Sequence, residues 1–389
     1  MEALAEGIFY VGVNDHDIDL FEGQYKLPTG VSYNSWVILD EKIAVTDTVD
    51  CRRGDAFMPL LEAALEGREP DYLIISHVEP DHASSLKLFI DRYPGVCLVG
   101  NAKTWPELGY YFDLSAVKTL TVKEGDKLSL GRHELTFVMA PMVHWPEVMM
   151  YYEAATKTLF SADAFGTFGA LTGEAPTPEN WDDEARRYYF NIVGKYGQPV
   201  TTVLKKAAGL DVRRVNPLHG PVLEGDMLAH ALGKYATWAS YAPETPDAVL
   251  IAYASIYGNT AGAAKEMAAL LREKGAEVVV TDLAREDQSA ALAQAFRCGK
   301  IVLAASTMDG GVMPFMADFL HHLKIKAFQK RTVALIENGS WAPMAAKVMR
   351  SGLEEMKDIA IVEPVVSIRG AVKEENRAQM AAAVEAILG

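Results

Sequence analysis

The sequence predicts an α/β and α+β fold in two parts, a β-rich layered part with outer helices followed by a doubly wound parallel sheet. In residues 1–247 apolar strands alternate with turns and helices, whereas residues 248–389 repeat short strand–helix units of regular size. Between the two patterns, residues 241–247 hold two prolines within four residues, which is typical of a linker. We therefore expect one domain over residues 1–247 and a second over residues 248–389.

Composition and charge exclude several classes of protein. The net charge of −15 comes entirely from residues 1–247, which argues against a nucleic-acid partner. The first residues contain no basic segment, and no stretch is long and apolar enough to span a membrane, so we expect a cytoplasmic protein. The three cysteines form no Cys-x-x-Cys pair, which excludes a disulfide framework, a zinc ribbon and an attached rubredoxin-type iron site.

The first part begins with a predicted β-hairpin, because apolar runs at residues 37–39 and 43–45 flank a polar segment. Helical spacing of apolar residues predicts a helix over residues 56–65. Later apolar runs predict further strands, and two more helical patterns accompany them. The strands are expected at residues 72–75, 96–99, 117–122, 135–139, 158–161 and 215–218, and the helices at residues 82–92 and 228–238.

The segment HVEPDH places four potential metal ligands directly after the apolar strand at residues 72–75. These are His77, Glu79, Asp81 and His82. A single histidine or aspartate near a strand end is usually a capping or surface residue. Four together are harder to explain this way, because two buried carboxylates without a cation would repel each other and lose their hydration. The segment therefore predicts a metal site.

Three further candidate ligands follow apolar strands in the same part of the chain. His144 comes after the strand at 135–139, Asp163 after that at 158–161, and His219 after the apolar residues 215–218. Because neighbouring strands of a sheet bring their same-side ends together, we expect these side chains to converge. The set of seven makes a metal centre the stronger interpretation.

The second part reads as five short buried strands with intervening helices, the rhythm of a doubly wound sheet of strand order 2-1-3-4-5. Its first strand–helix turn holds two hydroxyl residues and a glycine, which suit a phosphate bound at a helix N-terminus. The turn lacks both Gly-Lys-Ser/Thr and G-x-G-x-x-G, so a monophosphate is favoured. Its residues are Ser255, Ile256, Tyr257, Gly258, Asn259 and Thr260.

Two later loops at strand ends add residues suited to a flat ring. Small residues let the backbone approach such a ligand, and Trp341 can stack on it or cover its edge. With the phosphate turn, the two loops predict a binding site for flavin mononucleotide (FMN). The candidate residues are Thr307, Met308, Asp309, Gly310 and Gly311 in one loop and Asn338, Gly339, Ser340 and Trp341 in the other.

Taken together, these motifs resemble the flavodiiron proteins, or A-type flavoproteins, over essentially the whole chain. That family combines a metallo-β-lactamase-like αββα domain with a flavodoxin-like domain. Its pattern H-x-E-x-D-H, then 61 residues, H, 18 residues, D, and a later H is met here. The resemblance implies that His77, Glu79 and His144 bind one iron and that Asp81, His82 and His219 bind the other. Asp163 would bridge the two.

The resemblance also implies an activity. The protein would be a terminal oxidoreductase that takes electrons from a carrier, rubredoxin in the family, through FMN to the two iron ions. The substrate would be dioxygen, reduced to water, nitric oxide, reduced to nitrous oxide, or both; a reduced deazaflavin is an alternative donor. The implied assembly is a head-to-tail homodimer, with a dimer of dimers as a further step, in which Trp341 approaches the metal site of the partner chain.

The sequence departs from the family pattern at two places, and two alternative functions are to be weighed against the one that the resemblance implies. Ser306 stands where many relatives have proline, and Asp309-Gly310 where Asn-Asn is frequent, which affects the expected flavin potential. One alternative is a metal-dependent hydrolase fused to a flavodoxin. It is disfavoured because Glu79 stands where hydrolytic zinc relatives usually have histidine, and a hard oxygen ligand favours iron. The other is a pure electron-transfer flavoprotein, which would not need all seven ligands.

Overall fold

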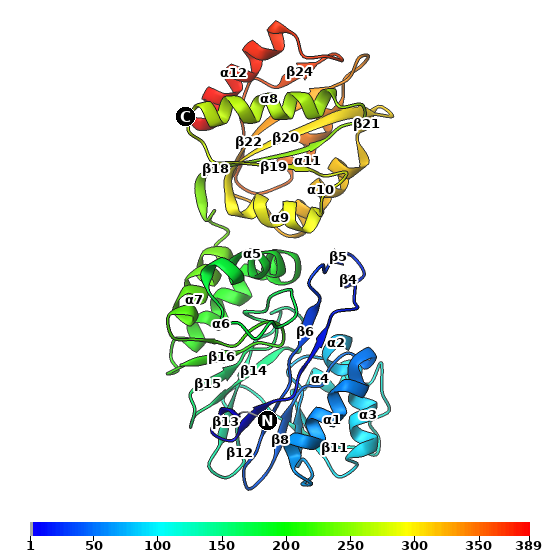
Figure 1. The fold of residues 1–389 in the computed structure, drawn as a ribbon, viewed down its shortest axis with the longest axis vertical. Coiled ribbons are helices and arrows are strands. Elements are labelled where there is room, and N and C mark those ends of the chain that lie inside the picture. Colours follow the sequence, from blue (N-terminus) through cyan, green and yellow to red (C-terminus); the bar gives the residue numbers. More distant parts are fainter. Residues whose placement is uncertain (1–2) are drawn as a thin grey trace. The chain divides into compact units, whose positions relative to one another are not determined.

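The computed structural model describes residues 3–389 and divides the chain into two compact units, Met1–Ala236 and Thr237–Gly389 (Figure 1). The division lies within helix α7 (Gly225–Ala239), before the boundary at 247/248 that the sequence suggests. Hydrogen bonds explain the difference, because Lys330 Nζ donates to the carbonyl of Ser240 and Arg331 Nη1 to that of Tyr241, both at 2.8 Å. The expected linker is therefore attached to the second unit, and β18 already begins at Thr245.

The first unit is built on two sheets that face each other across an apolar core. One sheet has the strand order β1-β2-β7-β8-β9-β10-β11 and the other β12-β13-β14-β15-β16-β17. Trp36 and Ile74 from the first sheet pack with Phe137, Tyr151 and Phe160 from the second. The strands are β1 (Ala3–Ala5), β2 (Ile8–Tyr10), β7 (Trp36–Ile38), β8 (Ala44–Thr46), β9 (Tyr72–Ile74), β10 (Cys97–Gly100), β11 (Lys118–Thr121), β12 (Lys127–Ser129), β13 (Glu134–Met139), β14 (Met149–Glu153), β15 (Thr158–Phe160), β16 (Arg214–Asn216) and β17 (Leu223–Glu224).

Helices and two short strand pairs complete the first unit. The pairs are β3 (Val13–Asp15) with β6 (Val31–Tyr33) and β4 (Leu20–Phe21) with β5 (Tyr25–Lys26). The helices are α1 (Gly54–Leu65), α2 (Pro80–Ala83), α3 (Leu86–Arg92), α4 (Thr104–Leu108), α5 (Pro178–Tyr188), α6 (Gly197–Ala207) and α7. In Figure 1, α1 and α3 lie beside the first sheet and α6 and α7 beside the second. With the two sheets between them, this is an αββα arrangement.

One predicted helix is divided in the structure. Instead of a continuous helix over residues 82–92, the chain forms the single turn α2 and then α3. The carbonyl of His82 accepts hydrogen bonds from the backbone N–H of Thr48 at 3.0 Å and from its hydroxyl at 2.6 Å. The backbone N–H of Ser85 turns to the carbonyl of Val49. These bonds to the segment after β8 replace the helical bonds that a continuous helix would need.

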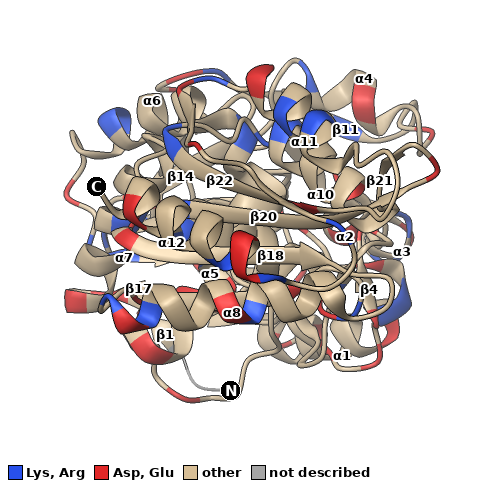
Figure 2. Ribbon diagram, turned by 90° about the horizontal axis from the view of Figure 1, so that it is seen from above, with Lys and Arg blue, Asp and Glu red and all other residues tan. Residues whose placement is uncertain are grey.

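The second unit is a parallel sheet with the strand order β19-β18-β20-β22-β23, which is the predicted 2-1-3-4-5 order. Helix α8 carries residues of both charge signs (Figure 2). No helix within residues 3–389 has the length and apolarity needed to cross a membrane. The elements are β18 (Thr245–Ala254), α8 (Asn259–Glu273), β19 (Val278–Asp282), α9 (Gln288–Arg297), β20 (Cys298–Met308), β21 (Gly311–Val312), α10 (Pro314–Ile325), β22 (Arg331–Asn338), α11 (Ala345–Glu354), β23 (Ile359–Ile361), β24 (Val366–Ile368) and α12 (Glu374–Leu388).

Candidate metal centre and flavin site

The HVEPDH segment turns directly from β9 into α2. His77 lies just beyond the strand, Glu79 is the N-cap residue of α2, and Asp81 and His82 lie within its single turn. Pro80 occupies the first helical position, where its missing N–H costs no hydrogen bond and its fixed φ favours the turn. A rigid turn at the end of a buried strand therefore presents four polar side chains from one short segment.

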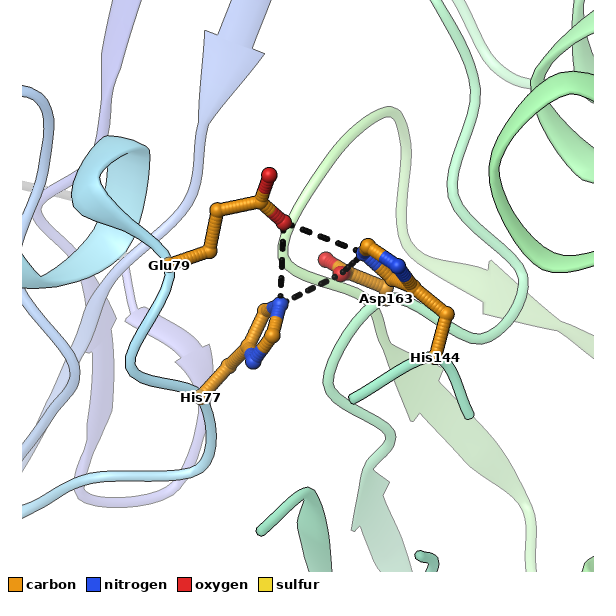
Figure 3. A group of neighbouring side chains, drawn as sticks. All are labelled: His77, Glu79, His144 and Asp163. Atoms are coloured by element: carbon orange, nitrogen blue, oxygen red, sulfur yellow. Dashed lines mark hydrogen bonds and ion pairs between the residues drawn. The ribbon is translucent and has the colours of Figure 1, made fainter. Parts of the chain in front are cut away.

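The first ligand group gathers side chains from both sheets of the first unit (Figure 3). His77 comes from the end of β9, His144 from the connection between β13 and β14, and Asp163 from the loop after β15. His77 Nε2 lies 3.1 Å from Glu79 Oε2 and 3.2 Å from Asp163 Oδ2. His144 Nε2 lies 3.0 and 3.1 Å from the same two oxygens. Two imidazole nitrogens and two carboxylate oxygens thus surround one point.

The second ligand group joins Asp81, His82 and His219, the last from the loop after β16. The Nε2 atoms of His82 and His219 are 3.0 Å apart, and they lie 3.4 and 3.2 Å from Asp81 Oδ2. Asp163 connects the two groups, because its Oδ2 faces the first while its Oδ1 lies 3.5 Å from His82 Nε2 and 3.8 Å from His219 Nε2. The structure therefore brings all seven predicted ligand residues together.

Hydrogen bonds outside the site decide which nitrogen of two histidines faces inward. His219 Nδ1 lies 2.7 Å from the carbonyl oxygen of Ser32. Since a carbonyl only accepts, Nδ1 carries the hydrogen and Nε2 presents a lone pair. His77 Nδ1 likewise lies 2.7 Å from Glu147 Oε1. In the neutral imidazoles the lone pairs of Nε2 and of the carboxylates then point at each other, as in the 3.2 Å approach of His219 Nε2 to Asp81 Oδ2, and a proton or a metal cation between them stabilises this arrangement.

The burial and the charge of the carboxylates also indicate a site for a bound cation. Both carboxylate oxygens of Asp81 and Oδ1 of Asp163 are buried without a hydrogen-bond donor among residues 3–389. Burial lowers the pKa of His144, but hydrogen bonds to Asp163 and Glu79 reverse this and raise it to about 9. Protons and a metal therefore compete for this imidazole. Each ligand group combines carboxylate oxygen, a hard ligand, with imidazole nitrogen, and the two groups share the carboxylate of Asp163. This set of ligands fits a pair of iron ions.

Strained backbone surrounds the site. Asp47, Met142, Ala162 and Phe165 are non-glycine residues with φ between +49° and +69°. Left-handed conformations of such residues cost energy and persist where the surrounding structure enforces them, commonly at functional sites. Ala162 directly precedes Asp163, so the strain is located at the turn that directs the central carboxylate.

Sequence reasoning missed two carboxylates that hold the HVEPDH segment in place. Glu147 is fully buried, and its Oε1 accepts from the Val78 backbone N–H at 2.9 Å as well as contacting His77 Nδ1. Asp47 accepts from the N–H and hydroxyl of Ser76 at 2.7 and 2.6 Å. Glu147 lies three residues after His144 in the sequence, but only the folded chain shows that it orients His77. Such second contacts fix the direction of a metal-binding imidazole.

A buried tyrosine beside the second ligand group was also missed. The Tyr188 ring centroid lies 5.5 Å from that of His219, and its hydroxyl has no hydrogen-bond partner among residues 3–389. A Cβ on Gly166 would lie 2.9 Å from the Tyr188 ring, so this glycine makes room for the phenol. Burial, with the charges of Asp163 and Asp81, raises the pKa of Tyr188 well above its usual range. The hydroxyl is therefore a neutral hydrogen-bond donor on a ring that lies beside the second ligand group.

The second unit contains a cavity of about 310 Å³ at the carboxyl ends of β18, β20 and β22. Gly258, the N-cap residue of α8, has φ +91°, and Ser255 Oγ accepts from its N–H at 3.1 Å. No Lys or Arg lines the cavity, so the N-terminal N–H groups of α8 must meet the charge of a bound phosphate. The lining residues are Ser255, Ile256, Tyr257, Asn259, Thr260, Ser306, Thr307, Asn338, Gly339, Ser340, Trp341 and Gly370.

Two exposed aromatic side chains lie at the edge of this cavity. Tyr257 is 93% exposed and Trp341 76% exposed, and both line the cavity. Flat side chains so placed can stack on a ring system. Gly370, which the sequence reasoning did not single out, is held there by reciprocal hydrogen bonds with the Asn338 amide at 2.8 and 3.0 Å.

One predicted flavin loop lies differently. The residues from Met308 to Gly311 form a tight turn between β20 and β21 and do not line the cavity. Asp309 and Gly310 occupy the turn with φ of +51° and +74°, which directs the chain back onto β20. The antiparallel pairing of Thr307 with Val312 therefore decides the path of this loop.

Comparisons with known proteins agree with the two-unit architecture. Residues 31–220 match the family described as ODP family beta lactamase, and residues 251–383 match flavodoxin. Over 343 residues the chain is 31% identical to the anaerobic nitric oxide reductase flavorubredoxin of Aeromonas hydrophila, covering 86% of this chain and 69% of that protein.

The fold is similar to solved structures over nearly the full chain. Rubredoxin oxygen:oxidoreductase from Desulfovibrio gigas superposes with a TM-score of 0.91 at 25% identity, covering 100% of this chain and 97% of that one. The flavodiiron protein from Giardia intestinalis has the same fold, with a TM-score of 0.91 at 23% identity, covering 98% of this chain and 95% of that one.

Proposed function

Because this chain belongs to the flavodiiron protein family, whose members carry FMN and a non-haem di-iron centre, we propose that it is a terminal oxidoreductase. In the cytoplasm it would take electrons from rubredoxin through FMN to the iron pair. The substrate is dioxygen, reduced to water, nitric oxide, reduced to nitrous oxide, or both. The names of two relatives support these choices, one a nitric oxide reductase flavorubredoxin and the other a rubredoxin oxygen:oxidoreductase.

The observation that carries the proposal is the position of Asp163, which directs one oxygen to each ligand group. On this proposal Asp163 bridges the two metals. His77, Glu79 and His144 hold one iron, and Asp81, His82 and His219 hold the other. Glu79 in the first group supports iron over the zinc of a hydrolase, because an anionic oxygen is a harder ligand than imidazole.

The chain's own residues have separate tasks in this function. The N–H groups at the start of α8 would hold the FMN phosphate, and Tyr257 and Trp341 would contact its ring. The bound cofactors supply the electron storage that a four-electron reduction of dioxygen requires. Tyr188 would donate a hydrogen bond to oxygen of the bound substrate, because its buried hydroxyl has no partner among residues 3–389.

We also propose that the working unit is a head-to-tail homodimer, with a dimer of dimers as a further assembly. Large exposed apolar side chains that line the flavin cavity support it, namely Tyr257, Trp341 and the 42%-exposed Ile256. Exposed apolar patches of this kind commonly mark protein contacts. In this arrangement the flavin of one chain would serve the metal centre of the other.

Purified protein is expected to contain two irons and one FMN per chain. The two ligand groups joined by Asp163 and the single cavity at α8 motivate these numbers. Elemental analysis and release of the flavin by denaturation measure them. Zinc as the main metal would favour the hydrolase alternative, and FAD in place of FMN would contradict the monophosphate interpretation of the α8 turn.

Turnover with each gas is expected to distinguish the substrates. Steady-state rates would be measured with chemically reduced rubredoxin as the donor and either dioxygen or nitric oxide as the acceptor. Consumption of at least one gas, with two molecules of water formed per dioxygen or one nitrous oxide per two nitric oxide, is the expected result. Protein with full iron and FMN that consumes neither gas would contradict the oxidoreductase assignment.

A further inference from the structure

The wall of the flavin cavity contains a pair of hydroxyl groups that belong to two different parts of the second unit. Thr260 lies in the first turn of α8, and Ser306 lies near the end of β20, 46 residues further along the chain. Thr260 Oγ1 and Ser306 Oγ are 2.8 Å apart, which is the distance of a hydrogen bond between hydroxyls. Both side chains line the cavity, although Thr260 is only 1% and Ser306 8% exposed. The pair is therefore part of the cavity wall and is shielded from solvent.

The backbone of each residue is held in place independently of its hydroxyl. Ser306 pairs with Asn338 in the parallel register of β20 and β22, and its carbonyl oxygen accepts from the Met313 N–H at 3.1 Å. Thr260 is the second residue of a 15-residue helix. Because both residues belong to regular elements, the distance between the two hydroxyls is set by the fold of the second unit and not by a mobile loop.

The chemistry of a phosphate decides the direction of this hydrogen bond. An ionised phosphate accepts hydrogen bonds, whereas a hydroxyl has a single hydrogen to donate. Thr260 lies among the first N–H groups of α8, which would meet the phosphate, so its own hydrogen is directed there. Its oxygen is then left to accept, and Ser306 Oγ is the donor that the structure places next to it. Two hydroxyl bonds in sequence polarise each other, so the bond from Ser306 strengthens the one that Thr260 donates.

We propose that Ser306 is a positioning residue for the cofactor phosphate: its hydroxyl donates to Thr260 Oγ1 and so keeps the Thr260 hydroxyl directed at the phosphate of FMN. The inference rests on the proposal that FMN occupies this cavity. A proline at position 306, as in many relatives, has no hydroxyl to donate. Ser306 therefore adds a contact that the common family pattern does not contain.

The test measures how tightly the full-length protein, freed of its flavin, binds FMN and riboflavin, which lacks the phosphate. Quenching of flavin fluorescence gives the two dissociation constants. The variants are Ser306→Ala, Thr260→Val, which replaces the hydroxyl by a methyl group of similar size, and the double variant. Ser306→Thr keeps a hydroxyl and is the conservative variant. Ser351→Ala, at an exposed position on α11, is the control.

Ser306→Ala is expected to bind FMN about fivefold more weakly than the wild type and riboflavin equally well, because it loses a hydroxyl that acts only on the phosphate. Thr260→Val should weaken FMN binding by about 30-fold, since its lost bond is to a charged group. The double variant should bind FMN as Thr260→Val does, because Ser306 acts through Thr260. Ser306→Thr and Ser351→Ala should keep the wild-type affinity for FMN.

Two results overturn the inference. Equal weakening of FMN and riboflavin binding in Ser306→Ala would show a purely structural role, and this comparison needs no variant of Thr260. A larger loss for Ser306→Ala than for Thr260→Val, or additive losses in the double variant, would show that Ser306 does not act through Thr260. Wild-type protein that binds FMN no more tightly than riboflavin would instead contradict the phosphate site on which the inference rests.

Discussion

Replacing Asp163 by alanine is expected to remove most of the iron and to abolish gas reduction, while FMN is still reduced by the donor. Asp163 is buried and approaches both ligand groups, with Oδ2 near His77 and Oδ1 near His82. Without it, four imidazoles and two carboxylates would have to balance two cations, and neither group would keep its shared oxygen. We expect a loss of turnover of more than about 100-fold, beyond that seen for residues which only orient ligands.

Iron per chain, FMN per chain and the rate of flavin reduction by the donor measure this outcome separately. The flavin rate should be unchanged, because the FMN site belongs to the other compact unit. Asp211→Ala, which removes an exposed carboxylate paired with Lys157, is the control and should retain iron and turnover. Full iron occupancy with normal turnover in Asp163→Ala would show that Asp163 does not bridge the metals.

Mixing two inactive variants is expected to restore activity if the flavin of one chain serves the iron pair of the other. His77→Ala loses iron binding and keeps the flavin cavity. Gly258→Glu puts a side chain at a position with φ +91° and a negative charge where the phosphate would lie, while the metal ligands stay intact. Roughly a quarter of wild-type activity should return, since random pairing makes about half of the dimers mixed and each has one complete pair.

The double variant His77→Ala/Gly258→Glu mixed with wild type provides the matched control. Head-to-tail transfer makes each such mixed dimer inactive, because every flavin-to-iron pair lacks one member. Transfer within one chain would leave the wild-type half of that dimer active and would restore nothing in the first mixture. Mass spectrometry of the intact dimers establishes that mixed species have formed before either rate is interpreted.

Sequence reasoning reached the seven residues that the structure groups at the candidate metal centre, because their pattern is local and repeated. His77 to His82 lie within one turn after a buried strand, and His144, Asp163 and His219 each follow a strand. The alternation of strands and helices in the second part likewise predicted the parallel sheet and its order, which the structure confirms. These features depend on the spacing of apolar residues and on the rule that the ends of neighbouring strands meet at one edge of a sheet. Both can be applied to the sequence alone.

The tertiary structure alone decided which other groups surround those ligands. Glu147 reaches His77, and Tyr188 lies beside His219, although the two members of each pair are far apart in the chain. The interruption between α2 and α3 depends in the same way on Thr48. No local pattern marks these residues, because a buried polar group is satisfied by whichever partner the fold brings near it, and that partner is chosen by packing.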